Sequence, residues 1–228
     1  MSITSRCRHR VLVTSVIKNP ILHPTRGRPM RARGAAMTSP AQTHCRSTTS
    51  DVIGPLSEGR PAIFVDQHGD GVLFFAGSRS TISLLHFAIR HSTGLILALL
   101  RHNRLDNLRI PDQPVFASEQ STLKFTVAVD AATGVTTGIS AHDRALTLRT
   151  LADPTSTPAS VTRPGHVLPV RCEGTDQDSD FAKALDLVAR ADSRCLAAGA
   201  CHLVADSGET LRGSSLSAFA RTHDLVLL

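Results

Sequence analysis

The feature that most constrains the fold is a regular alternation of short apolar runs with helical patterns, which begins near residue 51. Runs at 61–66, 71–76 and 94–100 are each bounded by turn residues, as is typical of buried strands. From Ile82 to Ile89 apolar residues recur at helical spacing, and Ser80 is the expected N-cap. Strands that alternate with helices predict an α/β (α+β) fold, a single layered domain with a mixed β-sheet flanked by helices.

The second half of the chain continues this alternation. Further strands are expected at 122–130, 200–205 and 225–228. A helix capped by Ser140 is expected to run to about Leu151, another to begin at Ser179 or Asp180, and a third to span 215–222, while 153–162 has the composition of a loop. The side chains expected to point inward from the first two helices are Ala145, Leu146, Leu148, Phe181, Ala184, Leu185, Leu187 and Val188.

The first fifty residues differ in charge from the rest of the chain. They hold nine Lys and Arg and no Asp or Glu, whereas residues 51–228 hold 16 basic and 19 acidic residues, a net charge of −3. The whole-chain charge of +6 therefore comes from the leader, and nucleic-acid binding is not expected. We interpret 1–50 as a disordered basic leader or a mis-assigned start, and 51–228 as the domain.

Several interpretations of this leader remain open. The apolar run 11–17 follows three Arg residues and faintly resembles a signal peptide, while the acid-free, Arg- and Ser-bearing composition resembles a transit peptide. Met37 is an alternative start. Four prolines in the leader argue against a long regular element there. The sequence has no run of 18 apolar residues, so we expect a cytoplasmic protein without a membrane partner.

The five cysteines form no C-x-x-C pair and are irregularly spaced. This pattern argues against a disulfide framework or a zinc site, and favours small buried thiols in a reducing compartment.

Two segments carry residues that core packing does not require. Residues 134–144 combine Gly, Thr and Ser just before a predicted helix, a composition suited to holding a phosphate or sugar hydroxyls, although a tight turn with an N-cap would look similar. Residues 163–169 place His166 beside Gly165, where an imidazole can act as an acid or base, although a purely structural histidine is the common alternative.

Both segments resemble motifs of the 3,4-dihydroxy-2-butanone 4-phosphate synthase family, namely G-V-T-T-G-x-S-x-x-D-R and R-P-G-H, and the resemblance runs in order from about Glu58 to the C-terminus. It implies an Mg²⁺-dependent lyase of riboflavin biosynthesis that converts ribulose 5-phosphate into 3,4-dihydroxy-2-butanone 4-phosphate and formate, and that works as a homodimer. It also implies a catalytic role for His166. The residues expected to bind the phosphorylated sugar are Thr136, Thr137, Arg144 and Arg163.

Two departures from the family pattern concern the metal. The family's acidic loop D-D-E-x-R-E-N-E-G-D corresponds here to residues 65–70, in which His68 stands at the last Glu and Asp70 matches the final Asp. The family's T-R-x-G-H-T corresponds to residues 175–180, with Asp180 near the position of the metal-binding His, and its active-site Glu aligns with His202. Mg²⁺ is thus expected from the family while its ligands are not retained, which leaves the metal unknown, or none.

The resemblance and the departures together leave three functions open. His166, His202 and Asp70 are the catalytic candidates, and His68 and Asp180 would complete a rearranged site, possible for a softer metal. The chain is then a synthase whose activity is weak, altered or absent. The alternatives are a non-catalytic phosphosugar-binding or dimer-partner paralogue, and a lyase acting on a related sugar phosphate.

Overall fold

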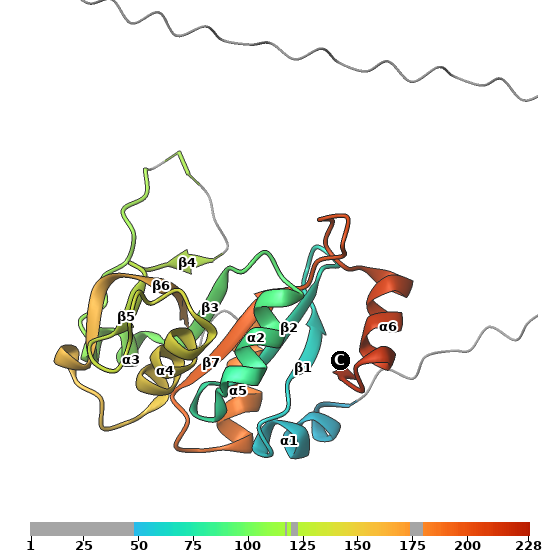
Figure 1. Ribbon diagram of the computed structural model, residues 1–228, viewed down its shortest axis with the longest axis horizontal. Helices are drawn as coiled ribbons and strands as arrows, with labels where there is room; N and C mark the ends of the chain where they lie inside the picture. Colours follow the sequence, from blue (N-terminus) through green and yellow to red (C-terminus); the bar gives the residue numbers. More distant parts are fainter. Residues whose placement is uncertain (1–47, 117, 120–122, 174–179) are drawn as a thin grey trace, which may run out of the picture. The chain divides into compact units, whose positions relative to one another are not determined.

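The computed structural model describes residues 48–116, 118–119, 123–173 and 180–228. Within them, helices and strands alternate around one sheet (Figure 1). The helices are α1 (Thr49–Ser57), α2 (Ile82–Arg90), α3 (His102–Asn107), α4 (Ala141–Ala152), α5 (Asp180–Ala191) and α6 (Gly213–Thr222). The strands are β1 (Ala62–Val65), β2 (Gly71–Ala76), β3 (Ile96–Arg101), β4 (Lys124–Phe125), β5 (Val129–Ala131), β6 (Val161–Cys172), β7 (Ala197–His202) and β8 (Val226–Leu227).

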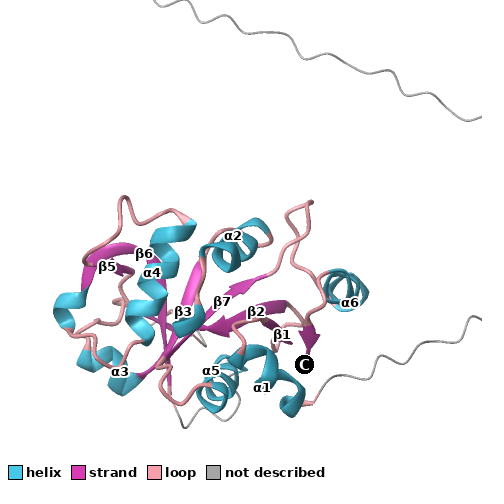
Figure 2. Cartoon of the chain, turned by 60° about the horizontal axis from the view of Figure 1, so that its bottom comes forward, coloured by secondary structure: helices cyan, strands magenta, loops and turns pink. Residues whose placement is uncertain are grey.

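The described strands form a single mixed sheet in the order β4-β6-β3-β7-β2-β1-β8, and β5 pairs with β6 beside this path. Strand β3 is parallel to β6 and β1 is parallel to β8, whereas the other pairs are antiparallel. Helices α2 and α4 lie on one side of the sheet, and α1 and α5 lie on the other (Figure 2). The predicted fold class, a layered domain with a mixed sheet flanked by helices, is confirmed.

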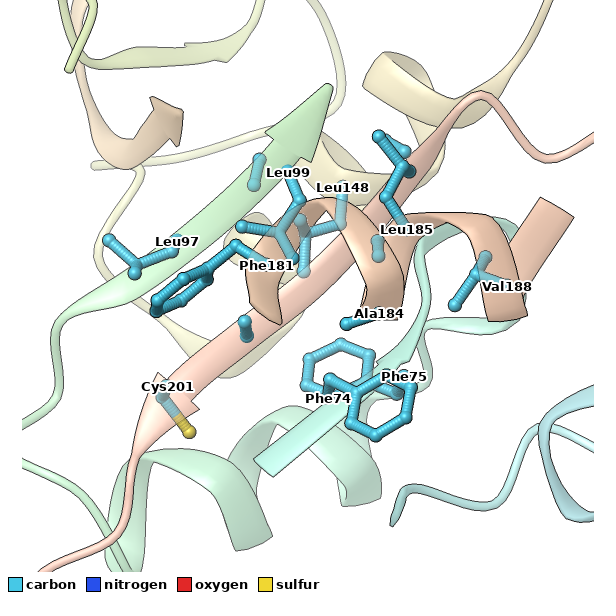
Figure 3. Packing of buried hydrophobic residues seen from close by; sticks show 14 of the residues in the cluster. Phe74, Phe75, Leu97, Leu99, Leu148, Phe181, Ala184, Leu185, Val188 and Cys201 are labelled. Atoms are coloured by element: carbon cyan, nitrogen blue, oxygen red, sulfur yellow. The ribbon is translucent and has the colours of Figure 1, made fainter. Parts of the chain in front are cut away.

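The core lies between the sheet and its helices. Phe74 and Phe75 of β2 are fully buried, and α5 covers the apolar surface of β3 and β7 (Figure 3). Because Trp and Tyr are absent, phenylalanine supplies the large rings, and Phe64 contacts the rings of both Phe74 and Phe181. The predicted inward face of α5 is confirmed, since Phe181, Ala184, Leu185, Leu187 and Val188 are all buried.

The element boundaries differ from the sequence-based prediction at several places. The expected single strand at 122–130 is two short strands, β4 and β5. Thr81, not Ser80, caps α2, because the Thr81 hydroxyl accepts the backbone N–H of Leu84. On α4, Ser140 is the cap as expected, but Leu146 is only half-buried. The strand expected at 200–205 is β7, which begins and ends three residues earlier.

Three elements have no counterpart in the sequence-based prediction. Helices α1 and α3 are short, and β6 runs through the segment interpreted as a loop and a Pro-Gly motif. The expected leader, residues 1–50, lies outside the described residues up to position 47. None of the helices in the described part of the chain is long and apolar enough to cross a membrane.

The cysteines of the described ranges are consistent with the thiol interpretation. Cys172, Cys195 and Cys201 are free and buried. Burial raises the pKa of Cys172 and of Cys201 to about 12, so these thiols stay protonated near neutral pH. Cys7 and Cys45 lie outside the described residues.

Candidate functional site

The strand register brings two predicted catalytic residues to the same edge of the sheet. Ile96 at the start of β3 is opposite Val167 of β6, and Leu97 is opposite Ala200 of β7. His166 immediately precedes Val167, and His202 ends β7 two residues beyond Ala200. Because β3 separates the two strands, their backbones run about 10 Å apart, at twice the usual spacing between neighbouring strands.

His166 is held by the carboxylate of Asp130 on β5. One Asp130 oxygen, Oδ1, accepts the backbone N–H of His166 at 2.9 Å, and the other, Oδ2, lies 2.8 Å from the ring nitrogen Nδ1. The Asp130 side chain is 8% exposed, whereas the His166 side chain is 40% exposed. The ring thus has a buried carboxylate on one side and open surface on the other.

Two glycines make this contact possible. A Cβ on Gly165 would lie 2.0 Å from the carbonyl carbon of Val129, so a side chain there would separate β6 from β5. A Cβ on Gly138 would lie 2.0 Å from Asp130 Oδ2 and 2.5 Å from His166 Nδ1. Gly138 also has a positive φ of 83°, which glycine adopts without strain. The loop backbone therefore packs directly against the imidazole–carboxylate pair.

The loop itself is organised by Asp143 in the first turn of α4. Asp143 Oδ2 accepts the backbone N–H groups of Thr136 and Gly138 at 3.2 and 3.1 Å, and the Thr136 hydroxyl at 2.8 Å. Hydrogen bonds from His142 and then Thr136 hold the pKa of Asp143 well below its usual range. Both threonines are exposed, and the Thr136 hydroxyl is used by the turn through its bond to Asp143. Their expected role in sugar binding stays a prediction.

The two arginines expected to bind the sugar both contact backbone carbonyls. Arg144 is buried and donates from Nε to Ile139 at 2.9 Å and from Nη1 to Gly94, and burial lowers its pKa. Arg163 donates from Nη2 to Leu108, and its Nε is buried without a hydrogen-bond partner among the described residues. These contacts shape the loops; sugar binding by either arginine stays a prediction.

A second imidazole–carboxylate pair lies at the end of β1. His202 Nε2 is 3.3 Å from Asp66 Oδ2, and Asp66 Oδ1 accepts the backbone N–H groups of His68 and Asp70, both at 2.9 Å. Asp66 is 7% exposed and His202 is 34% exposed, which parallels the pair formed by Asp130 and His166. Phe181 at the start of α5 contacts the His202 ring, so the first turn of this helix lies beside the pair.

Asp70 is engaged by Arg212, the residue before α6. The Arg212 Nε–H donates to Asp70 Oδ1. Burial raises the pKa of Asp70, but hydrogen bonds from Arg212 and Thr210 together outweigh this effect, so the pKa lies below its usual value. Asp70 therefore remains a carboxylate whose charge is balanced by a guanidinium.

The described residues at this edge do not fit a Mg²⁺ site. Mg²⁺ binds oxygen ligands, and carboxylates supply most of them in proteins. Both oxygens of Asp66 already have protein partners, and Asp70 is paired with Arg212. In the described ranges, no three His, Cys, Asp or Glu side chains are grouped to hold a metal ion. Asp180 pairs with Lys183 at the start of α5, and residues 175–179 lie outside the described residues.

The structure therefore brings Asp70 and His202 together, and places His166 on the neighbouring part of the same edge. Sequence reasoning missed the partners of these three residues, namely Asp66, Asp130 and Arg212. Asp66 and Asp130 share a usable signal, because each carboxylate lies at the end of a short apolar run, next to Val65 and Val129 respectively. Such positions bring side chains to the edge of a sheet.

Comparisons with known proteins agree on one family. Residues 50–228 match the sequence model of 3,4-dihydroxy-2-butanone 4-phosphate synthase. A riboflavin biosynthesis protein RibBA of Salinispora arenicola is 37% identical over 187 residues, which cover 79% of this chain and 44% of the relative. A RibBA of Endomicrobium trichonymphae is 34% identical over 188 residues, 80% of this chain and 46% of the relative. The chain thus spans less than half the length of these curated relatives.

Solved structures give the same result. A 3,4-dihydroxy-2-butanone 4-phosphate synthase in complex with two magnesium ions superposes with a TM-score of 0.74 at 30% identity, over 80% of this chain and 92% of that chain. The synthase of Candida albicans superposes with a TM-score of 0.73, also at 30% identity, over 80% of this chain and 93% of that chain.

Proposed function

The chain belongs to the 3,4-dihydroxy-2-butanone 4-phosphate synthase family, and from this premise we propose that it is a divergent member that binds a small phosphorylated sugar. In this proposal the sugar lies at the sheet edge that carries His166 and His202. The Mg²⁺-dependent conversion of ribulose 5-phosphate into 3,4-dihydroxy-2-butanone 4-phosphate and formate is weak, altered or absent, and the protein acts as a homodimer.

The observation that carries this proposal is that the carboxylates near His202 already have hydrogen-bond partners within the protein. Asp66 accepts two backbone N–H groups and contacts His202, and Asp70 is paired with Arg212. Binding of a divalent cation by Asp70 would have to displace the charge-assisted hydrogen bond that Arg212 donates to this carboxylate. A weakened metal site accounts for weak synthase chemistry, because that reaction develops negative charge on an enediolate.

The loop before α4, where sugar binding is expected, has one feature that favours a phosphate and one that opposes it. Helix N-termini attract phosphate because their N–H groups lack partners inside the helix. Here the exposed Thr137 lies just before this N-terminus. The carboxylate of Asp143, however, already uses the N–H groups of Thr136 and Gly138. A phosphate at this loop would meet that negative charge, so we expect weak, millimolar-range affinity.

Two alternatives remain, and each has a supporting feature. A non-catalytic phosphosugar-binding or dimer-partner paralogue is favoured by the occupied carboxylates. A lyase acting on a related sugar phosphate is favoured by the two imidazole–carboxylate pairs, since imidazole is the side chain best suited to move protons near neutral pH.

Formate release from ribulose 5-phosphate with Mg²⁺ tests the proposal directly. The protein is purified from a host that lacks its own synthase, and His166→Ala is the matched inactive control. We expect turnover at least roughly 100-fold below that of a RibBA relative assayed in parallel, because each lost acid or base contributes about 10²–10⁴-fold. Turnover equal to the relative's would overturn the proposal of weakened activity.

Binding is measured separately. Ribulose 5-phosphate is titrated into ¹⁵N-labelled protein, and we expect shifts centred on Thr137 and His166. Shifts that are unchanged in His166→Ala would place the sugar elsewhere. The absence of any shift at millimolar sugar would contradict the sugar-binding role and leave the dimer-partner alternative.

A further inference from the structure

We propose that Asp130 is a positioning residue that fixes His166 with its proton on Nδ1, so that Nε2 presents its lone pair to the site. The assignment of the proton follows from the chain's own hydrogen bonds and can be tested without substrate. Its value for catalysis rests on the proposed function, in which His166 is the acid or base.

The direction of the hydrogen bond follows from what each group can donate. An ionised carboxylate only accepts hydrogen bonds. Asp130 Oδ2 lies 2.8 Å from His166 Nδ1, so the proton between these atoms belongs to the ring nitrogen. Because a neutral imidazole carries one N–H, a proton on Nδ1 leaves Nε2 as an acceptor.

The orientation of the carboxylate is fixed as well. Asp130 Oδ1 accepts the backbone N–H of His166 itself at 2.9 Å, so the carboxylate cannot rotate without losing that bond. Gly138 packs against Oδ2 and Nδ1 from the loop side. Asp130 is nearly buried, and water therefore cannot easily replace either contact. The backbone N–H of His166 thus fixes the Asp130 carboxylate, and this carboxylate in turn orients the His166 ring.

The consequence for chemistry depends on which ring nitrogen is free. A base takes a proton through its lone pair, and with the opposite tautomer Nε2 would donate a hydrogen bond instead. In a serine protease, exchanging the aspartate behind the catalytic histidine for asparagine leaves the geometry intact but lowers kcat by about 10⁴, because the tautomer is wrong. The Asp130–His166 pair has the same dependence on the buried carboxylate.

Asp130→Asn is the sharpest test because its geometry dictates the outcome. The asparagine oxygen is held in the Oδ1 position by the backbone N–H of His166, so the amide NH₂ must face Nδ1. Nδ1 then has to accept, and the ring proton moves to Nε2. Asp186→Asn on α5 is the control, because Asp186 is exposed and pairs with Arg101 away from His166.

The ring nitrogens are observed by long-range ¹H–¹⁵N correlation NMR, and the spectrum of His166→Ala identifies the His166 signals. We expect Nδ1–H in the wild type at a pH where the ring is neutral, Nε2–H in Asp130→Asn, and no change in Asp186→Asn. If Asp130→Asn does not fold, the wild-type spectrum alone still shows which ring nitrogen of His166 carries the proton. An Nε2–H wild-type ring, or a folded Asp130→Asn with an unchanged tautomer, would overturn the proposal.

Activity is a second measurement, and it tests whether the position of the ring proton matters for turnover. Where sugar turnover is measurable, Asp130→Asn is expected to lower kcat by about 10²–10⁴-fold while leaving KM within about threefold, since the ring stays in place but cannot act as a base. Equal losses in Asp130→Asn and Asp186→Asn would contradict the positioning role. An Nδ1–H ring without any turnover would retain this proposal and remove only the synthase activity.

Discussion

At the scale of single residues, the site consists of side chains held by their neighbours more than of side chains left free. Asp130 contacts the ring of His166, and Asp66 contacts the ring of His202. Asp143 binds the Thr136 hydroxyl and so holds the loop 134–144. In both imidazole pairs the second carboxylate oxygen is fixed by backbone N–H groups. The histidines are thus oriented before any ligand binds, which reduces the cost of ordering them during binding.

Gly138→Ala should lower the free energy of unfolding by more than the cost of placing a side chain at positive φ. Gly208 is the matched control, since both glycines have φ near +85° but a Cβ on Gly208 would meet nothing within 4 Å. We expect Gly208→Ala to lower the free energy of unfolding by about 1–2 kcal/mol, the cost of a left-handed side-chain-bearing residue. Gly138→Ala should cost about 1–3 kcal/mol more, because its methyl group collides with Asp130 and His166.

Urea unfolding of both variants measures this difference, and the His166 ring signals report whether the pair has moved. Equal losses of stability in Gly138→Ala and Gly208→Ala would mean that the pair yields without cost and is not rigidly packed.

The sequence predicted part of this site, for a definable reason. His166 and the Thr136–Thr137 loop stood out because dense polar motifs have no role in a core. Asp130 did not stand out, because a single carboxylate after an apolar strand is common and its partner is 36 residues away in sequence. Arg212 was missed for the same reason, since its partner Asp70 is 142 residues away in sequence.

At the scale of elements, α2 and α6 are joined by a cluster of four rings, Phe87, His91, Phe219 and His223. The closest pair, Phe219 and His223, has ring centroids 4.4 Å apart, and the centroids of His91 and His223 are 5.0 Å apart. Both histidines lie at the C-terminal caps of their helices. This cluster is therefore a contact between helices that contains two ionisable rings.

The cluster should make stability depend on pH. Burial lowers the pKa of His91, as do the charges of His223 and Arg90, while Asp206 opposes them. The folded protein thus prefers neutral His91, and the unfolded chain binds more protons below the ordinary histidine pKa of 6.5. We expect the free energy of unfolding to be fully retained above about pH 6.5 and to fall as the pH drops below it.

Urea unfolding between pH 5 and 8 measures this dependence. His91→Phe, which keeps a ring in the cluster, should flatten the profile, whereas His86→Phe on the exposed side of α2 should not. A profile with the same slope in His91→Phe and the wild type would exclude His91 as its source.

Elements were predicted well where their pattern was long and local. Helix α5 repeats apolar residues at helical spacing over twelve positions, and all its buried residues except Ala182 were predicted. Strand β6 was missed because Pro164 and Gly165 are typical of turns. In the structure these residues fall where the β5–β6 pairing shifts register, an irregularity set by contacts with a distant strand.

At the scale of the whole molecule, the homodimer implied by the family gains support from the surface beside the site. Leu95 and Ile139 are 52% and 55% exposed. They lie close together, because Arg144 bonds the carbonyls of Gly94 and Ile139. Large apolar side chains grouped on a surface mark interaction sites. We propose that a second copy of the chain covers them.

A protein that begins at Thr48 tests both the domain limits and the dimer. We expect its melting temperature to lie within about 2 °C of the full chain's, since surface changes usually alter stability by less than about 0.5 kcal/mol. We also expect it to sediment as a dimer at tens of micromolar, and Ile139→Glu to shift it towards monomer. A melting temperature many degrees lower would show that the leader contributes to the fold, and a monomeric wild type would contradict the dimer.

The position of β7 sets the order in which the sheet can be assembled. This strand fills the place between β3 and β2, yet it is made roughly 120 residues after β2. At about 5–20 residues per second, a ribosome needs roughly 6–24 s for that stretch. Throughout this interval β2 lacks β7 as a neighbour, and β3 lacks it from the time that β3 itself is made. Pairings of such long sequence separation are slow to form. The centre of the nascent sheet therefore closes late, before only the edge strand β8, and it is the part most exposed to aggregation during synthesis.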